Sequence, residues 1–130
     1  MKKVTTHEIF QATITIGLKR NYTQKVISEA SVLGQLQKLQ NKLIEERKVY
    51  LSANCFPSTI VLSRQREPHL NLQFINYPKF ILKKKAFKEA VEIIAEQLMN
   101  AFDQNRIVIQ FHDSNVMLEH TSEIDPLIKK

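Results

Sequence analysis

Hydrophobic and polar residues alternate along the first regular stretch of the chain. From Gln11 to Lys19 every second side chain is apolar, and these positions are Ala12, Ile14, Ile16 and Leu18. A period of two with β-branched residues predicts a half-buried strand. The opposite face of this strand carries threonines and Gly17, so we expect that face to meet solvent or a partner.

Two longer stretches follow the helical period instead, with apolar residues every three or four positions. We predict one helix from Glu29 to Arg47 and a second from Lys83 to Gln104. Ser28 is the predicted N-cap of the first helix, because a serine hydroxyl can accept a hydrogen bond from a backbone N–H of the first turn. Each helix has one apolar stripe and therefore has one face to bury.

Strand periodicity returns between the two helices. The alternation from Lys48 to Ser63 is interrupted by Pro57, which predicts either one bent strand or two short ones. The polar segment from Arg64 to Pro68 predicts a turn, and the alternation from His69 to Ile75 predicts a strand antiparallel to the one before it.

The chain after the second helix predicts a terminal hairpin. Residues 107–111 and 116–120 alternate, and Asp113, Ser114 and Asn115 between them are turn formers. The element order β-α-β-β-α-β is that of the ferredoxin-like, or split βαβ, arrangement. We therefore predict an α+β sandwich, an antiparallel sheet with two helices on one face and an extra C-terminal hairpin strand. Residues 1–120 form the predicted domain and residues 121–130 a C-terminal arm.

Composition limits the classes of protein that fit. The chain has 130 residues, a net charge of +6 and one cysteine, Cys55; its length suits one domain, and an internal disulfide is excluded. No apolar stretch fits a signal peptide or a membrane span, so we expect a cytoplasmic protein without a membrane partner. The layout is similar to that of small ferredoxin-like proteins whose sheets pair as dimers, which implies a homo-oligomer formed through the open sheet face.

The positive charge makes nucleic acid an alternative partner. The strand from His69 to Asn76 lacks the glycine and the aromatic spacing of the RNA-recognition family. An ordinary member of that family is therefore excluded, while binding through the nucleic-acid backbone stays open. The candidate anion- or nucleic-acid-binding residues are Arg64, Arg66, Lys79, Lys83, Lys84, Lys85 and Lys88.

Catalytic, cofactor and metal motifs are missing from the sequence. With only Gly17 and Gly34, no glycine-rich phosphate-binding loop can form. If Ser114-Asn115 is a two-residue loop, His112 and Glu119 are diagonal neighbours and His120 lies on the other face, so we predict no metal site. We interpret Cys55 as a structural thiol, and we expect no cofactor.

These observations favour a non-catalytic, oligomeric binding or assembly protein whose ligand the sequence does not specify. Two alternatives remain open. One is a nucleic-acid-binding module with RNA-recognition topology, and the other is a cofactor-free enzyme with its pocket at a subunit interface. The missing catalytic motifs favour a protein that is not an enzyme.

Overall fold

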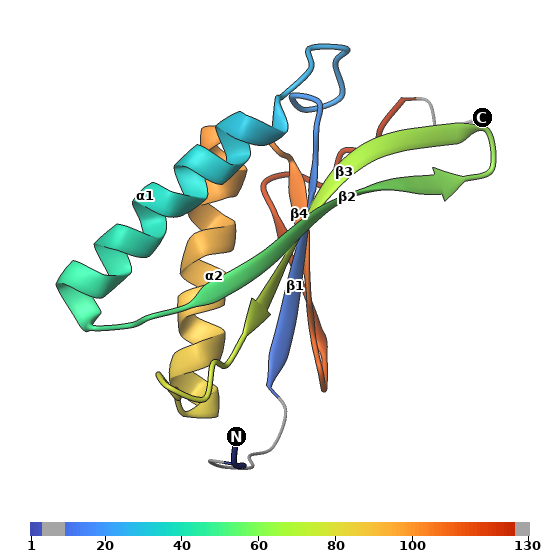
Figure 1. Cartoon of the computed structure of the whole chain (residues 1–130). Helices are drawn as coiled ribbons and strands as arrows, with labels where there is room; N and C mark the ends of the chain where they lie inside the picture. Colours follow the sequence, from blue (N-terminus) through green and yellow to red (C-terminus); the bar gives the residue numbers. More distant parts are fainter. Residues whose placement is uncertain (4–9, 127–130) are drawn as a thin grey trace.

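Two helices pack on one face of a five-stranded antiparallel sheet in the computed structural model (Figure 1). The structure describes residues 1–3 and 10–126. The sheet order is β2-β3-β1-β4-β5, which is the ferredoxin-like order with β5 added at the β4 edge, so the predicted α+β fold is confirmed. The strands are β1 (Gln11–Gly17), β2 (Ser52–Leu62), β3 (Gln65–Ile75), β4 (Arg106–Phe111) and β5 (Asn115–Glu119), and the helices are α1 (Glu29–Arg47) and α2 (Lys84–Ala101).

The helix ends follow from local chemistry. Ser28 caps α1 as predicted, since its hydroxyl accepts a hydrogen bond from Ser31 N at 3.1 Å. The second helix ends before the predicted Gln104, because Asp103 has a φ of 50° that no helix continues through. In the part of the chain that the structure describes, neither helix is long and apolar enough to cross a membrane.

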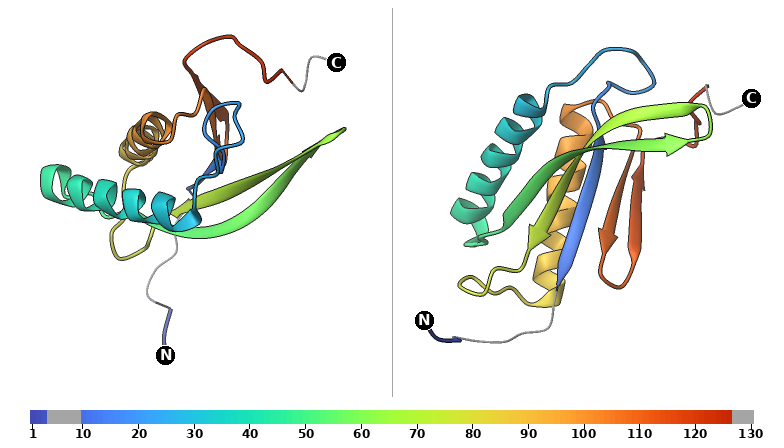
Figure 2. Two further views of the ribbon diagram at one scale, coloured as in Figure 1. Left: turned by 90° about the horizontal axis from the view of Figure 1, so that it is seen from above. Right: turned by 45° about the vertical axis from the view of Figure 1, so that its right-hand side comes forward.

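The core lies between the helices and one face of the sheet. The side chains that fill it are fully enclosed, and the largest of them come from β1, β3, α2 and β4. They are Ile14, Ile16, Leu70, Leu72, Phe74, Phe87, Ile94, Leu98, Ile107 and Ile109. The other sheet face carries no helix (Figure 2), so its side chains are left to solvent or to a ligand.

The β2–β3 hairpin is longer than the sequence pattern predicts. The predicted turn Arg64–Pro68 is wrong in extent, because the turn is at Ser63 and Arg64 and β3 already begins at Gln65, opposite Leu62. Pro57 and Pro68 are tolerated inside the strands since β2 is an edge strand and β1, on the other side of β3, ends at Gly17. The hairpin tip therefore projects past the rest of the sheet (Figure 2).

Candidate functional site

A hollow on the open sheet face centres on Gly17, the last residue of β1, which pairs with His69 of β3. A Cβ atom at this position would lie 3.0 Å from Gln104 Oε1 and 3.6 Å from His69 Nε2. Because glycine has no side chain, these two polar atoms border an open space instead of a methyl group. The space belongs to a pocket with a cavity volume of about 450 Å³, which is a size typical of small-molecule sites.

Both polar tips beside the glycine are held by backbone groups. Gln104 is 8% exposed, and its Nε2 donates to the carbonyls of Lys19 at 2.9 Å and Phe102 at 3.0 Å. The amide oxygen is thus the end that faces the hollow. His69 Nδ1 lies 3.1 Å from Glu67 O, and since a carbonyl only accepts, Nδ1 is the donor and Nε2 is an acceptor in the neutral ring.

A chain of hydrogen bonds starts at Thr15, which lines the pocket, and crosses three strands. Thr15 Oγ1 of β1 donates to Asn71 Oδ1 of β3 at 3.0 Å. Asn71 Nδ2 in turn donates to Ser58 Oγ of β2 at 2.6 Å and to Phe56 O at 3.3 Å. Asn71 is 9% exposed, so these bonds satisfy a polar side chain that would otherwise be buried at a cost. Of these residues Thr15 lines the pocket, so the bonds tie that part of its lining to β3 and β2.

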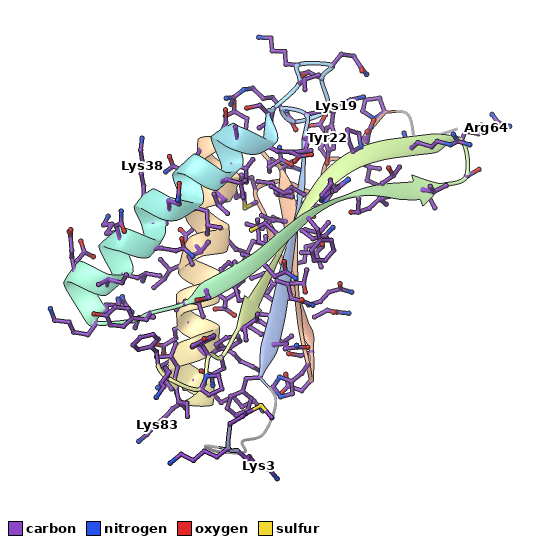
Figure 3. The ribbon with its side chains drawn as sticks, viewed as in Figure 1. Lys3, Lys19, Tyr22, Lys38, Arg64 and Lys83 are labelled. Carbon is purple, nitrogen blue, oxygen red and sulfur yellow. The ribbon has the colours of Figure 1, made fainter. Side chains whose placement is uncertain are left out.

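One wall of the pocket is a network around Tyr22. The Tyr22 hydroxyl accepts from Arg106 at 2.7 Å and from Asn105 at 3.2 Å, and it lies 3.1 Å from Glu123 O, to which it donates. Arg106 of β4 also donates to Glu119 of β5, and mainly this hydrogen bond raises the pKa of the guanidinium. The network joins the loop after β1, which carries Tyr22 (Figure 3), to β4, β5 and the segment after β5.

The pocket contains charges of both signs. Glu67 points to the same sheet face as His69, because the two are separated by one residue of β3. Within the described residues, its carboxylate makes no ion pair or side-chain hydrogen bond. The charged lining residues are Lys19, Arg64, Arg66 and Arg106, which are positive, and Glu67 and Asp125, which are negative. Such a lining suits a small ligand that itself carries both charges.

The basic residues predicted to bind an anion or nucleic acid do not form one patch. Figure 3 shows Arg64 at the tip of the β2–β3 hairpin and Lys83 at the start of α2, at opposite ends of the molecule. Lys84 and Lys88 both pair with Asp113, at 2.6 Å and 3.0 Å, and these contacts lower the pKa of the Asp113 carboxyl. The members that line the pocket are Arg64 and Arg66, and those that do not are Lys79, Lys83, Lys84, Lys85 and Lys88.

The terminal hairpin has a different register from the one that a two-residue loop predicts. Glu119 lies opposite Arg106, and β5 begins at Asn115, so the connection between the strands is longer. His112 lies beside Phe10 instead, at 5.4 Å between ring centroids. Within residues 1–3 and 10–126, no group of three or more His, Cys, Asp or Glu side chains could hold a metal ion.

Sequence reasoning missed this pocket because it placed Glu67 in a turn. The polar alternation of Gln65, Glu67 and His69 runs through Pro68 and was the available indication that β3 begins early. Gly17 was correctly placed on an open face, but the pattern of one strand does not reveal that Gln104, 87 residues later, reaches that face.

The chain is similar to a known enzyme family and to solved structures that bear the same family name. The model of the SAM lyase family, whose name denotes an S-adenosylmethionine-degrading enzyme, matches residues 7–118. A phage SAM lyase in its apo state has a similar fold, with a TM-score of 0.69 and 13% identity over 88% of this chain and 92% of that one. A phage SAM lyase in complex with S-methyl-5′-thioadenosine gives a TM-score of 0.67 and 13% identity over 95% and 99% of the two chains. No curated protein matches significantly.

These findings correct the functional interpretation of the sequence. The hypothesis of a non-catalytic binding or assembly protein without a specified function is wrong, and so is the alternative of an RNA-binding module, because the matching family is defined by one enzymatic activity. The physical reason for the error is that the pocket is built from isolated polar residues on four segments, which form no local motif. With most of its length matched by the family model, the chain belongs to the SAM lyase family.

Proposed function

We propose that this protein cleaves S-adenosylmethionine and releases S-methyl-5′-thioadenosine. The observation that carries the proposal is the pocket at Gly17, which has room for a nucleoside-sized ligand and is lined by charges of both signs. The charges of S-adenosylmethionine are complementary to this lining, because the molecule carries a carboxylate, an ammonium group and a sulfonium cation. The family match and the phage SAM lyase that holds S-methyl-5′-thioadenosine support the same assignment.

The proposed reaction breaks the bond between the sulfonium sulfur and the side-chain carbon of the methionine part. The bonding electron pair moves to sulfur, which becomes the neutral thioether of S-methyl-5′-thioadenosine. The carbon left behind is attacked by the substrate's own carboxylate, and the second product is homoserine lactone. This step adds no water and removes no carbon-bound proton, so it needs no general base. Opposite charges disappear together, which a site that excludes water favours.

The role of the protein is then to hold the substrate folded so that its carboxylate reaches the carbon. A positioned nucleophile in the same molecule raises the rate greatly over a free one. We propose that Glu67 holds the ammonium or sulfonium group and that Arg64 and Arg66 attract the charged end of the substrate into the pocket. Gln104 Oε1 and His69 Nε2, both acceptors beside Gly17, are suited to the donors of the adenosine part.

The second proposal concerns the open sheet face, which we infer to be covered by another copy of the chain. The observation that favours this is the projecting β2–β3 hairpin, whose tip exposes Ile60, Val61 and Leu62 to 43%, 63% and 56%. Consecutive exposed apolar residues on a projecting arm are typical of a contact surface. Light scattering of the parent protein and of Leu62→Asp, whose side chain lies opposite Gln65 on the open face, tests this. We expect an oligomeric parent and a smaller molar mass for the variant, and a monomeric parent at high concentration would overturn the inference. The cytoplasmic location and the division of the chain at residue 120 stay predictions.

Product analysis tests the proposed reaction. The protein is incubated with S-adenosylmethionine, and the products are separated and identified by mass spectrometry. We expect S-methyl-5′-thioadenosine and homoserine lactone in equal amounts. S-adenosylhomocysteine is the control, because its neutral sulfur is a poor leaving group and it should persist. Release of homoserine with incorporation of labelled water from the start would contradict the internal attack, and absence of S-methyl-5′-thioadenosine would contradict the activity itself.

A further inference from the structure

A second groove lies on the helix side of the molecule, where α1, the residues leading into β2 and the loop after β3 meet. Its cavity volume is about 490 Å³, which again suits a small molecule. Its floor includes Leu51, which is 5% exposed. No residue that lines this groove also lines the pocket at Gly17, so the two are separate sites.

Two stacked aromatic rings form one side of the groove. Tyr50 and Phe80 stack with 4.9 Å between ring centroids and 24° between planes, and the rings of Tyr77 and Phe80 lie 6.3 Å apart between centroids. Tyr50 is 41% exposed, Phe80 49% and Tyr77 47%. Aromatic rings presented to solvent in this way offer a flat surface on which another planar ring can stack.

The loop that carries Phe80 is held in place by polar contacts. The Asn76 side chain bonds Leu82 twice, as donor to Leu82 O and as acceptor from Leu82 N, both at 2.9 Å. Phe80 N donates to Tyr77 O at 2.9 Å and closes a turn inside the loop. The backbone around Phe80 is thus held before any ligand arrives, which lowers the entropy cost of binding.

Side-chain amides form the opposite side of the groove. Gln37, Gln40 and Asn41 lie on one face of α1, because Gln40 and Asn41 follow Gln37 by three and four positions. Gln40 donates to Leu51 O at 2.9 Å, whereas the amides of Gln37 and Asn41 make no hydrogen bond to another described residue. None of the described residues that line the groove carries a charge.

From this geometry we propose that the second groove binds the base of a neutral adenine nucleoside. Stacking against Tyr50 and Phe80 favours a planar ligand, and the uncharged lining gives a phosphate or carboxylate no charged partner. Asparagine and glutamine amides match adenine in particular, because one amide can accept from N6 and donate to N7 at once. The inference does not rest on the proposed cleavage of S-adenosylmethionine, since the two sites share no residue.

The test is a titration of the isotope-labelled full chain with adenosine, followed by nuclear magnetic resonance. We expect shifts of the Tyr50 and Phe80 ring signals and of the Gln37 and Asn41 side-chain amides. Phe80→Ala should weaken adenosine binding at this groove about tenfold and leave the release of S-methyl-5′-thioadenosine unchanged. Asn41→Ala is a second variant that an exposed helix position tolerates, and Lys42→Ala, its exposed neighbour outside the groove, is the matched control.

Three outcomes would overturn the proposal. The first is that adenosine shifts only signals around Gly17 and His69, which would leave the proposed activity intact and the second groove without a ligand. The second is that Phe80→Ala and Asn41→Ala bind adenosine as the parent does. The third is that the Tyr50 and Phe80 signals move with protein concentration and not with adenosine, which would make this groove a contact between copies of the chain.

Discussion

Two groups of basic side chains lie at opposite ends of this protein, and only one of them borders a pocket. Arg64 and Arg66 line the pocket on the open sheet face, whereas Lys84 and Lys88 at the start of α2 are paired with Asp113 from the β4–β5 connection. The denser group in the sequence is therefore the one with a structural partner. A carboxylate brought from 25 residues away decides which charges are left for a ligand.

The largest effect should come from filling the pocket end. Gly17→Val would place a branched side chain where even a Cβ would lie only 3.0 Å from Gln104 Oε1, closer than ordinary van der Waals contact. We expect the rate of S-methyl-5′-thioadenosine release to fall about hundredfold, because a bound substrate that is displaced no longer has its reacting atoms aligned. Valine suits a strand, but Gln104, which is held by the Lys19 and Phe102 carbonyls, has to shift, so the thermal midpoint should fall moderately while the variant still folds. Unchanged turnover with a folded variant would show that the pocket is not the site.

A smaller effect should separate the two basic groups directly. The double variant Arg64→Ala/Arg66→Ala removes two charges at the pocket, and Lys83→Ala/Lys85→Ala removes two at the far end. We expect the first to raise KM about tenfold, in line with the loss of charged contacts to a substrate, and the second to leave it unchanged. Steady-state kinetics at low and moderate salt measures KM for both. Equal effects of the two variants would contradict the view that only the group at the pocket acts on the substrate.

The other glycine of the chain offers a contrast in stability. A Cβ at Gly34, inside α1, meets no atom within 4 Å. Gly34→Ala should therefore raise the free energy of unfolding by about 0.5–1 kcal/mol, because alanine restricts the unfolded chain and favours the helix. Chemical denaturation measures the gain, and turnover should stay at the parent level. A loss of stability would mean that the space beside Gly34 is tighter than the structure shows.

The smallest effect should appear at the paired lysines. Hydrogen bonds from Lys84 and then Lys88 depress the pKa of Asp113, so their stabilisation is present above the ordinary carboxyl pKa of about 4 and is lost as the pH falls toward the depressed value. Asp113→Asn should lower the thermal midpoint slightly at neutral pH and leave turnover unchanged. Melting curves from pH 7 downward check this, and the parent and variant should converge in acid.

The elements were predictable because their signals are local. The bounds of α1 and the cap at Ser28 follow from side chains within a few residues of each other. The alternation of β1 similarly identifies both its buried face and its open face. The error at Arg64–Pro68 has the same origin, since polar residues and a proline indicate a turn unless a neighbouring strand pairs with them.

The sequence by itself determined the α+β fold and an open sheet face with a glycine on it, since hydrophobic period and element order act over short distances. Only the tertiary structure decided what that face is for. Gln104 reaches Gly17 after the whole second helix has folded back, and Glu67 turns toward the pocket because β2 pairs with it. Lys84 and Lys88 of α2 meet Asp113 because the fold brings the start of that helix beside the β4–β5 connection. Contacts between residues far apart in the sequence bring these side chains together, and no local sequence pattern predicts them.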